Sequence, residues 1–158
     1  MIAWVFAPGC VGKKTFIWNA VKASAHEEYA KYKLALGFSL SETVLPVLPS
    51  IYMDDGSKLP ENSNQRFRRR YEILASLINM PFNLIIHGQW PDDQHLINKL
   101  VSKDQRCYYL ETTEFQYKLN RVTRGVKPKD YKKLIQTWES KVIPKLESVF
   151  GSIQRIKF

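Results

Sequence analysis

The residues best suited to chemistry lie in one short segment near the start of the chain, FAPGCVGKKTF, residues 6–16. An apolar run, residues 2–6, precedes it, and apolar side chains at helical spacing follow it. A phosphate-binding loop needs this order, with glycines that let successive backbone N–H groups turn inward and a lysine that reaches the β- and γ-phosphate oxygens. The segment therefore predicts such a loop, although a Pro-Gly turn before a helix shares part of the pattern. Its expected nucleotide-binding residues are Gly9, Cys10, Val11, Gly12, Lys13, Lys14 and Thr15.

Lys14 departs from the common pattern, which places a Ser or Thr hydroxyl at this position to meet Mg²⁺. The order GK-x-T resembles the loop of nucleoside-monophosphate kinases such as adenylate kinase, in which this position carries no hydroxyl. The resemblance implies ATP and Mg²⁺ as cofactors, with the metal held through water or by carboxylates elsewhere. Thr15 is the candidate metal contact within the loop, and a hydrogen bond to an α-phosphate is its other expected role.

A second segment, YMDDGSK at residues 52–58, resembles the RDD-x-R region of the phage polynucleotide kinase family. In that family, an aspartate at the end of the second strand accepts the proton of the acceptor hydroxyl. The resemblance therefore implies that Asp54 is the catalytic base, with Asp55 as the second choice. An Asp-Asp-Gly turn at the surface is the alternative interpretation.

A third segment, residues 111–134, resembles the lid of kinases of the polynucleotide kinase type: a helix with spaced arginines, an Arg-Gly loop, a proline and another helix. The lid itself is expected over about 114–130. Arg121 and Arg124 are three residues apart and can share one helical face. The resemblance implies that both arginines neutralise charge on the transferring phosphoryl group. A solvated basic helix face is the alternative.

The strand LIIH, residues 84–87, occupies the place where relatives often carry an aspartate that binds metal. This chain has His87 there, and Asp92 or Asp93 is the substitute that the sequence offers. A hydrogen-bonded structural role is the more ordinary one for a single histidine.

Basic and aromatic side chains also suggest a nucleic-acid partner. The net charge is +9 and the isoelectric point is near 9.6, which suits a polyanion because each neutralised phosphate releases counterions. The alternative for the arginines among them is a solvated surface charge, and the alternative for the tryptophan is a packed residue at the rim of the sheet. The candidate DNA-contacting residues are Arg66, Arg68, Arg69, Arg70 and Trp90.

The chain alternates apolar runs with helical patterns, which predicts an α/β fold with a three-layer α/β/α parallel sheet of the P-loop kinase type and a small helical lid. We expect one domain over residues 1–158. Strands are expected over 2–6, near 50–53, and over 82–88, 106–112 and 152–158. Helices are expected over about 13–25, 61–80, 92–102, 113–125 and 129–150, with a break in the last near Pro144.

Composition narrows the setting in which such a protein works. The hydrophobic content of 44% is that of a soluble globular protein, and no apolar run approaches the length of a membrane span. Cys10 and Cys107 form no paired framework, so we expect free thiols and a cytoplasmic protein, in the host cytoplasm if a phage encodes it.

Together these features favour ATP-dependent phosphoryl transfer to a hydroxyl on DNA. Small phage kinases that phosphorylate the hydroxymethyl group of a modified pyrimidine, such as 5-hydroxymethyluracil in DNA, belong to the type that the chain resembles. A deoxynucleoside-monophosphate kinase is the first alternative, because of the GK-x-T loop and the small size. A non-catalytic P-loop module that binds nucleic acid is the second, and Lys14 and His87 are the residues that favour it.

Overall fold

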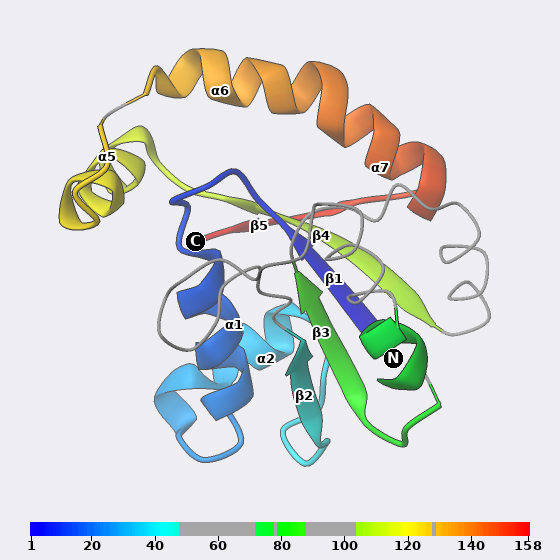
Figure 1. Ribbon diagram of the computed structural model, residues 1–158. Coiled ribbons are helices and arrows are strands. Elements are labelled where there is room, and N and C mark those ends of the chain that lie inside the picture. Colours follow the sequence, from blue (N-terminus) through cyan, green and yellow to red (C-terminus); the bar gives the residue numbers. More distant parts are fainter. Residues whose placement is uncertain (48–71, 78, 88–103, 128) are drawn as a thin grey trace.

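A computed structural model describes residues 1–47, 72–77, 79–87, 104–127 and 129–158 of the chain (Figure 1). Its strands form one parallel five-stranded sheet in the order β2-β3-β1-β4-β5. They are β1 (Ile2–Phe6), β2 (Val44–Val47), β3 (Asn83–His87), β4 (Gln105–Glu111) and β5 (Gln154–Lys157). The fully buried β1 lies at the centre, so the loop that follows it emerges in the middle of the carboxyl edge of the sheet.

Helices follow β1 and β4, as the sequence pattern predicts, and residues 92–102, where a further helix was expected, lie outside the described residues. The helical elements are α1 (Lys13–Lys22), a 3₁₀ turn (Glu27–Tyr29), α2 (Ala30–Ala35), α5 (Glu114–Thr123), α6 (Tyr131–Thr137), a π-helical segment (Trp138–Val142) and α7 (Ile143–Phe150). Residues 72–77 are also helical. Within the described ranges, no helix is both long and apolar enough to cross a bilayer.

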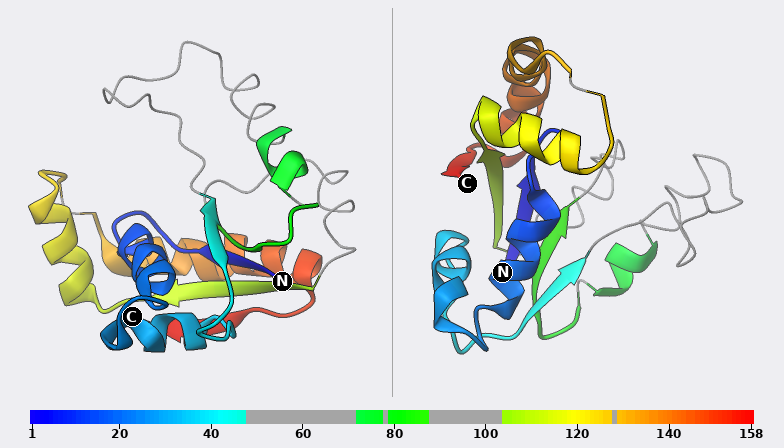
Figure 2. Two further views of the ribbon diagram at one scale, coloured as in Figure 1. Left: turned by 90° about the horizontal axis from the view of Figure 1, so that it is seen from below. Right: turned by 90° about the vertical axis from the view of Figure 1, so that its left-hand side faces the viewer.

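The sheet has a separate hydrophobic core on each face, because successive side chains of a strand point to opposite sides. Ala3 and Val5 join one core, into which α1 packs Phe16, Ile17 and Ala20. Ile2, Trp4 and Phe6 join the other core, with Leu74 from the helix at 72–77 and Leu146 from α7. Figure 2 shows α1 and α2 on one side of the sheet and the helix at 72–77 on the other. The α/β class and the parallel sheet are thus confirmed, and the arrangement is compatible with three layers.

Most element boundaries agree with the sequence prediction to within three residues. One exception is α2, which the sequence pattern did not predict. The other is the second strand, because the strand that the structure describes is Val44–Val47 and contains Pro46. Residues 50–53, where a strand was expected, lie outside the described residues. Proline lacks an N–H group, so a strand that contains it is tolerated at a sheet edge, and β2 is the edge strand.

The long C-terminal helix also differs from a simple α-helix. It runs from Tyr131 to Phe150, but the π-helical segment Trp138–Val142 interrupts its α-helical pattern just before Pro144. Proline has no amide to donate to the preceding turn, which explains why the regular ladder changes at this point. The interruption therefore falls close to the break expected from the sequence.

Candidate functional site

The loop between β1 and α1 adopts left-handed backbone conformations at two positions. Cys10 has φ 66°, which is unusual for a residue that is not glycine, and Gly12 has φ 96°. Gly12 is the N-cap of α1, and its carbonyl accepts a hydrogen bond from the Phe16 amide at 3.0 Å. Turns of this kind at a helix N-terminus form concavities that bind anions.

Close packing explains why position 12 requires glycine. A Cβ atom at this position would lie 2.7 Å from Cε1 of Phe158. The Phe158 ring is held edge-on against Phe16, with ring centroids 5.5 Å apart, and against Tyr32, with centroids 5.9 Å apart. The loop between β1 and α1 is thus supported from behind by an aromatic cluster of Phe16, Tyr32 and Phe158, which joins α1, α2 and the end of the chain.

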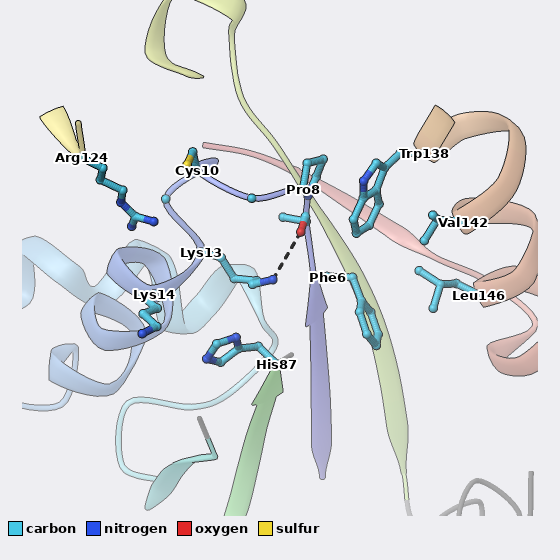
Figure 3. A pocket seen from close by; sticks show the side chains of 13 residues that line it. Phe6, Pro8, Cys10, Lys13, Lys14, His87, Arg124, Trp138, Val142 and Leu146 are labelled. Carbon is cyan, nitrogen blue, oxygen red and sulfur yellow. Dashed lines mark hydrogen bonds between the residues drawn. The ribbon is translucent and has the colours of Figure 1, made fainter. Parts of the chain in front are cut away.

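The loop opens onto a pocket of about 490 Å³, a size typical of sites for small ligands (Figure 3). Its polar lining side chains are Lys13, Lys14, His87 and Arg124. Its remaining lining residues are Phe6, Ala7, Pro8, Gly9, Cys10, Gly12, Trp138, Val142 and Leu146. In Figure 3 the cationic groups lie to one side of Phe6 and Pro8, and the side chains from the C-terminal helix lie to the other. One end of the pocket therefore suits an anion and the other an apolar ring.

Lys13 is the central polar group of this pocket. Its Nζ donates a hydrogen bond of 3.3 Å to the carbonyl oxygen of Ala7, the first residue of the loop. Burial lowers the pKa of Lys13 below its usual value, because desolvation disfavours the ammonium form. An anion bound beside Nζ would offset this cost, so the pocket favours a negatively charged ligand.

The other expected loop residues differ in what they present to the pocket. Gly9, Cys10 and Lys14 line it. The Val11 side chain is buried in the core, so only its backbone belongs to the loop surface. Thr15 is exposed on the first turn of α1 and is not among the residues found to line the pocket.

Helix α5, which lies in the segment expected to form a lid, is tied directly to the loop between β1 and α1. The Asn120 amide Nδ2 donates to the Cys10 carbonyl at 2.9 Å. Thr113 caps the helix by accepting a hydrogen bond from the Gln116 amide at 3.2 Å, and Gly125 closes it with φ 64°. The hydrogen bond between Asn120 and Cys10 therefore holds α5 beside the loop.

The two lid arginines have different environments. Arg124 lines the pocket. Arg121 is buried and donates through Nε at 2.7 Å, and also through Nη2, to the carbonyl of Lys127. Its Nη1 donates to the hydroxyl of Tyr117 at 3.4 Å and lies 4.0 Å from the Cys10 sulfur. The described geometry therefore brings Arg124 to the pocket, whereas Arg121 holds α5 to the residues that follow it.

The described residues of the pocket do not fit a magnesium site. His87, buried at the end of β3, faces the pocket, but none of the described lining residues is a carboxylate. Within the described part of the chain, no group of three or more His, Cys, Asp or Glu side chains could hold a metal. Several predicted site residues lie outside that part: Asp54, Asp55, Asp92, Asp93, Arg66, Arg68, Arg69, Arg70 and Trp90.

Sequence reasoning missed the apolar end of the pocket. We call Phe6, Trp138, Val142 and Leu146 the Trp138 wall. The last three lie within the helix expected over 129–150, and their four-residue spacing was the available signal. What the spacing did not show is that this helix lies over the carboxyl end of β1.

A comparison with models of protein families found no match to the chain, and a comparison with curated proteins found none either. The loop between β1 and α1, helix α5 and the pocket are therefore the features that indicate a function.

Proposed function

We propose that this protein is an ATP-dependent kinase of the P-loop type that transfers a phosphoryl group to a hydroxyl on DNA. The observation that carries the proposal is the loop between β1 and α1, in which Cys10 and Gly12 have left-handed backbone conformations. This loop and the half-buried Lys13 line a pocket of about 490 Å³. The pocket lies at the carboxyl ends of parallel strands, where α/β proteins commonly bind ligands. The hydroxymethyl group of a modified pyrimidine is the candidate acceptor.

The residues of the pocket have separate roles in this proposal. The amides at the start of α1 bind the phosphates, and the helix dipole adds to their attraction for negative charge. Lys13 leaves the Ala7 carbonyl and neutralises charge that develops between the β- and γ-phosphates. Arg124 approaches from the lid and stabilises the transferring group. ATP supplies the phosphoryl group.

The acceptor side of the proposal rests on the sequence resemblance and on charge. Asp54, outside the described residues, is the proposed base: it accepts the proton of the acceptor hydroxyl while the hydroxyl oxygen bonds to the γ-phosphorus and the bond to ADP breaks. The net charge of +9 favours a polyanionic acceptor such as DNA. Magnesium is part of the proposal through the family resemblance, and no step here is assigned to it.

A deoxynucleoside-monophosphate kinase is the second candidate, because position 14 carries Lys14 in place of a Ser or Thr, and the loops of those enzymes also lack a hydroxyl at this position. Such an enzyme would need no base, since its acceptor is already anionic. A non-catalytic module is the third, because the described pocket residues include no carboxylate.

One substrate panel separates these candidates. Purified protein is incubated with ATP and Mg²⁺ and with unmodified duplex DNA, hydroxymethylated duplex DNA or free deoxynucleoside monophosphates. Phosphate that appears on DNA supports the first candidate, and activity with monophosphates alone refutes it. ATP that binds but is not consumed with any acceptor supports the module.

The loop assignment has its own test. Lys13→Ala is expected to lower phosphoryl transfer by about 100-fold or more, because a half-buried cation at the transferring group is lost. Lys22→Ala, at the exposed end of the same helix, is the control and should leave transfer unchanged. Equal activity in the two variants would contradict the assignment of the loop as the nucleotide site.

A further inference from the structure

Trp138 is the outermost ring of an ordered stack. Its indole lies 5.8 Å from the ring of Tyr109, centroid to centroid, with 20° between the ring planes. The guanidinium of Arg155 lies 5.4 Å from the same tyrosine ring. The series therefore runs from the Arg155 cation through the Tyr109 ring to the Trp138 ring, and Trp138 lines the pocket.

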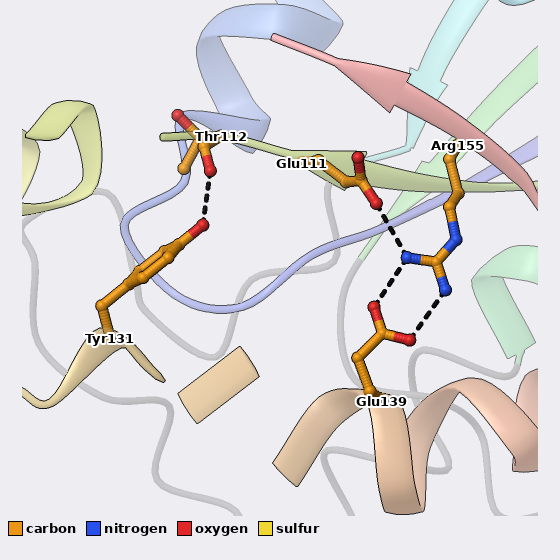
Figure 4. A network of polar contacts seen from close by, with 5 residues as sticks. All are labelled: Glu111, Thr112, Tyr131, Glu139 and Arg155. Carbon is orange, nitrogen blue, oxygen red and sulfur yellow. Dashed lines mark hydrogen bonds and ion pairs between the residues drawn. The ribbon is translucent and has the colours of Figure 1, made fainter. Parts of the chain in front are cut away.

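The base of this stack is fixed by ion pairs (Figure 4). Arg155 donates to both carboxylate oxygens of Glu139 at 2.6 and 2.7 Å, and to Glu111 at 2.8 Å. Glu139 is the residue next to Trp138, so the bidentate pair anchors the π-helical segment at the point where the indole projects. A ring held in this way loses little conformational freedom when a ligand stacks on it.

The π-helical segment also aligns the wall. In an α-helix, residues four apart drift by about 40° around the axis, since 3.6 residues make one turn. A π-helical turn contains more residues than an α-helical turn, so the segment from Trp138 to Val142 rotates less around the axis than an α-helix would. This smaller rotation compensates for the α-helical rotation between Val142 and Leu146. Three side chains at four-residue spacing thus all face the pocket.

We propose that the Trp138 wall binds the nucleobase of the DNA acceptor, taken out of its base stack. This inference rests on the proposed kinase function, which it deepens by naming the part of the acceptor that enters the pocket. Enzymes that modify a base must extrude it from the duplex, and they commonly stack it on aromatic side chains. Stacking on such a ring is tolerant of base identity, so an unpaired base of the acceptor is a suitable occupant.

The position of the wall favours the acceptor base over adenine. Lys13, which faces the transferring group, and the Trp138 wall line the same pocket. The adenine of ATP is separated from its γ-phosphate by a ribose and two further phosphates. An acceptor base that carries its hydroxyl, or lies next to it, must instead come close to the γ-phosphate. A ring that shares the pocket with Lys13 therefore fits the acceptor.

The test compares binding of two short DNA duplexes, one with a single 5-hydroxymethyluracil and one with an abasic site at the same position. We expect the wild type to prefer the duplex that carries the base. Trp138→Leu, which keeps apolar bulk without an aromatic face, should reduce this preference by about 5- to 100-fold. Trp138→Phe should keep most of it. Trp18→Leu, on the exposed side of α1 and not among the lining residues, should behave as the wild type does.

ATP affinity, measured by calorimetry on the same variants, separates the outcomes. Unchanged ATP binding with a lost base preference supports the proposal. Weakened ATP binding with an intact preference means that the wall holds adenine, and overturns it. An equal loss for both duplexes means that Trp138 only supports the fold, and a wild type without any preference also overturns the proposal. None of these readouts needs turnover, so a wild type that transfers no phosphate would refute the kinase alone.

Discussion

Gly12 gives the sharpest prediction about the loop, and the perturbation is Gly12→Ala. Two costs follow from the structure. A left-handed backbone with φ 96° costs a residue with a Cβ roughly 1–2 kcal/mol. The new Cβ would also lie 2.7 Å from the ring of Phe158, and overpacking of this kind typically costs about 1–3 kcal/mol. Alanine also lowers the conformational entropy of the unfolded chain, which offsets about 0.4–1 kcal/mol of these costs. We therefore expect the free energy of unfolding to fall by about 1–4.5 kcal/mol.

The assay is equilibrium unfolding in urea, followed by tryptophan fluorescence. Gly9→Ala is the matched control, because Gly9 has no positive φ and, apart from its chain neighbours, no heavy atom of the described residues lies within 4 Å of a Cβ built there. It should change the free energy of unfolding by about 0.5 kcal/mol or less. Adding Phe158→Ala to both backgrounds isolates the steric part, since that clash disappears with the ring while the backbone cost remains.

Two results would refute this reasoning. If Gly12→Ala and Gly9→Ala unfold at the same urea concentration, neither the backbone conformation nor the ring contact constrains the loop. If the Gly12→Ala cost is the same with and without the Phe158 ring, the aromatic cluster does not support the loop from behind.

Three further predictions follow from buried and paired groups. Lys33→Met should lower the free energy of unfolding by about 1–3 kcal/mol in urea, because the buried ammonium donates to two backbone carbonyls of the following loop at 2.7 and 3.0 Å. Burial raises the pKa of Cys107 to about 12. Alkylation of the native protein should therefore modify the half-buried Cys10 first and reach Cys107 only when the protein unfolds. Mass spectrometry of the alkylated protein measures this order. The hydrogen bonds from Arg155 hold the pKa of Glu139 below its usual 4.5. This pair therefore stabilises the fold above about pH 4.5, and its contribution is lost as the pH falls through the lower pKa of the folded state. Glu139→Gln should therefore flatten the acid side of the stability profile in urea unfolding, and an unchanged profile would contradict the pairing.

Local patterns in the sequence determined the parts of this protein that depend on neighbouring residues. The apolar runs predicted β1, β3 and β4, because buried parallel strands need apolar side chains on both faces. Gly12 and Lys13 predicted the loop, because a left-handed turn before a helix requires glycine and leaves a cation at the helix start. Thr113 and Gly125 marked the ends of the lid helix for similar reasons.

Tertiary structure alone decided which distant segments meet at the site. The distinct environments of Arg121 and Arg124 could not be predicted from their spacing, because the carbonyl of Lys127 and the hydroxyl of Tyr117 engage one guanidinium and leave the other to line the pocket. Trp138 lies more than a hundred residues from Phe6 in sequence, yet both line one pocket. Helical periodicity shows which side chains share a face, but it carries no information on which strand end that face covers. That choice depends on sheet order and on helix packing, and it is what placed an aromatic wall opposite the lysine of the loop.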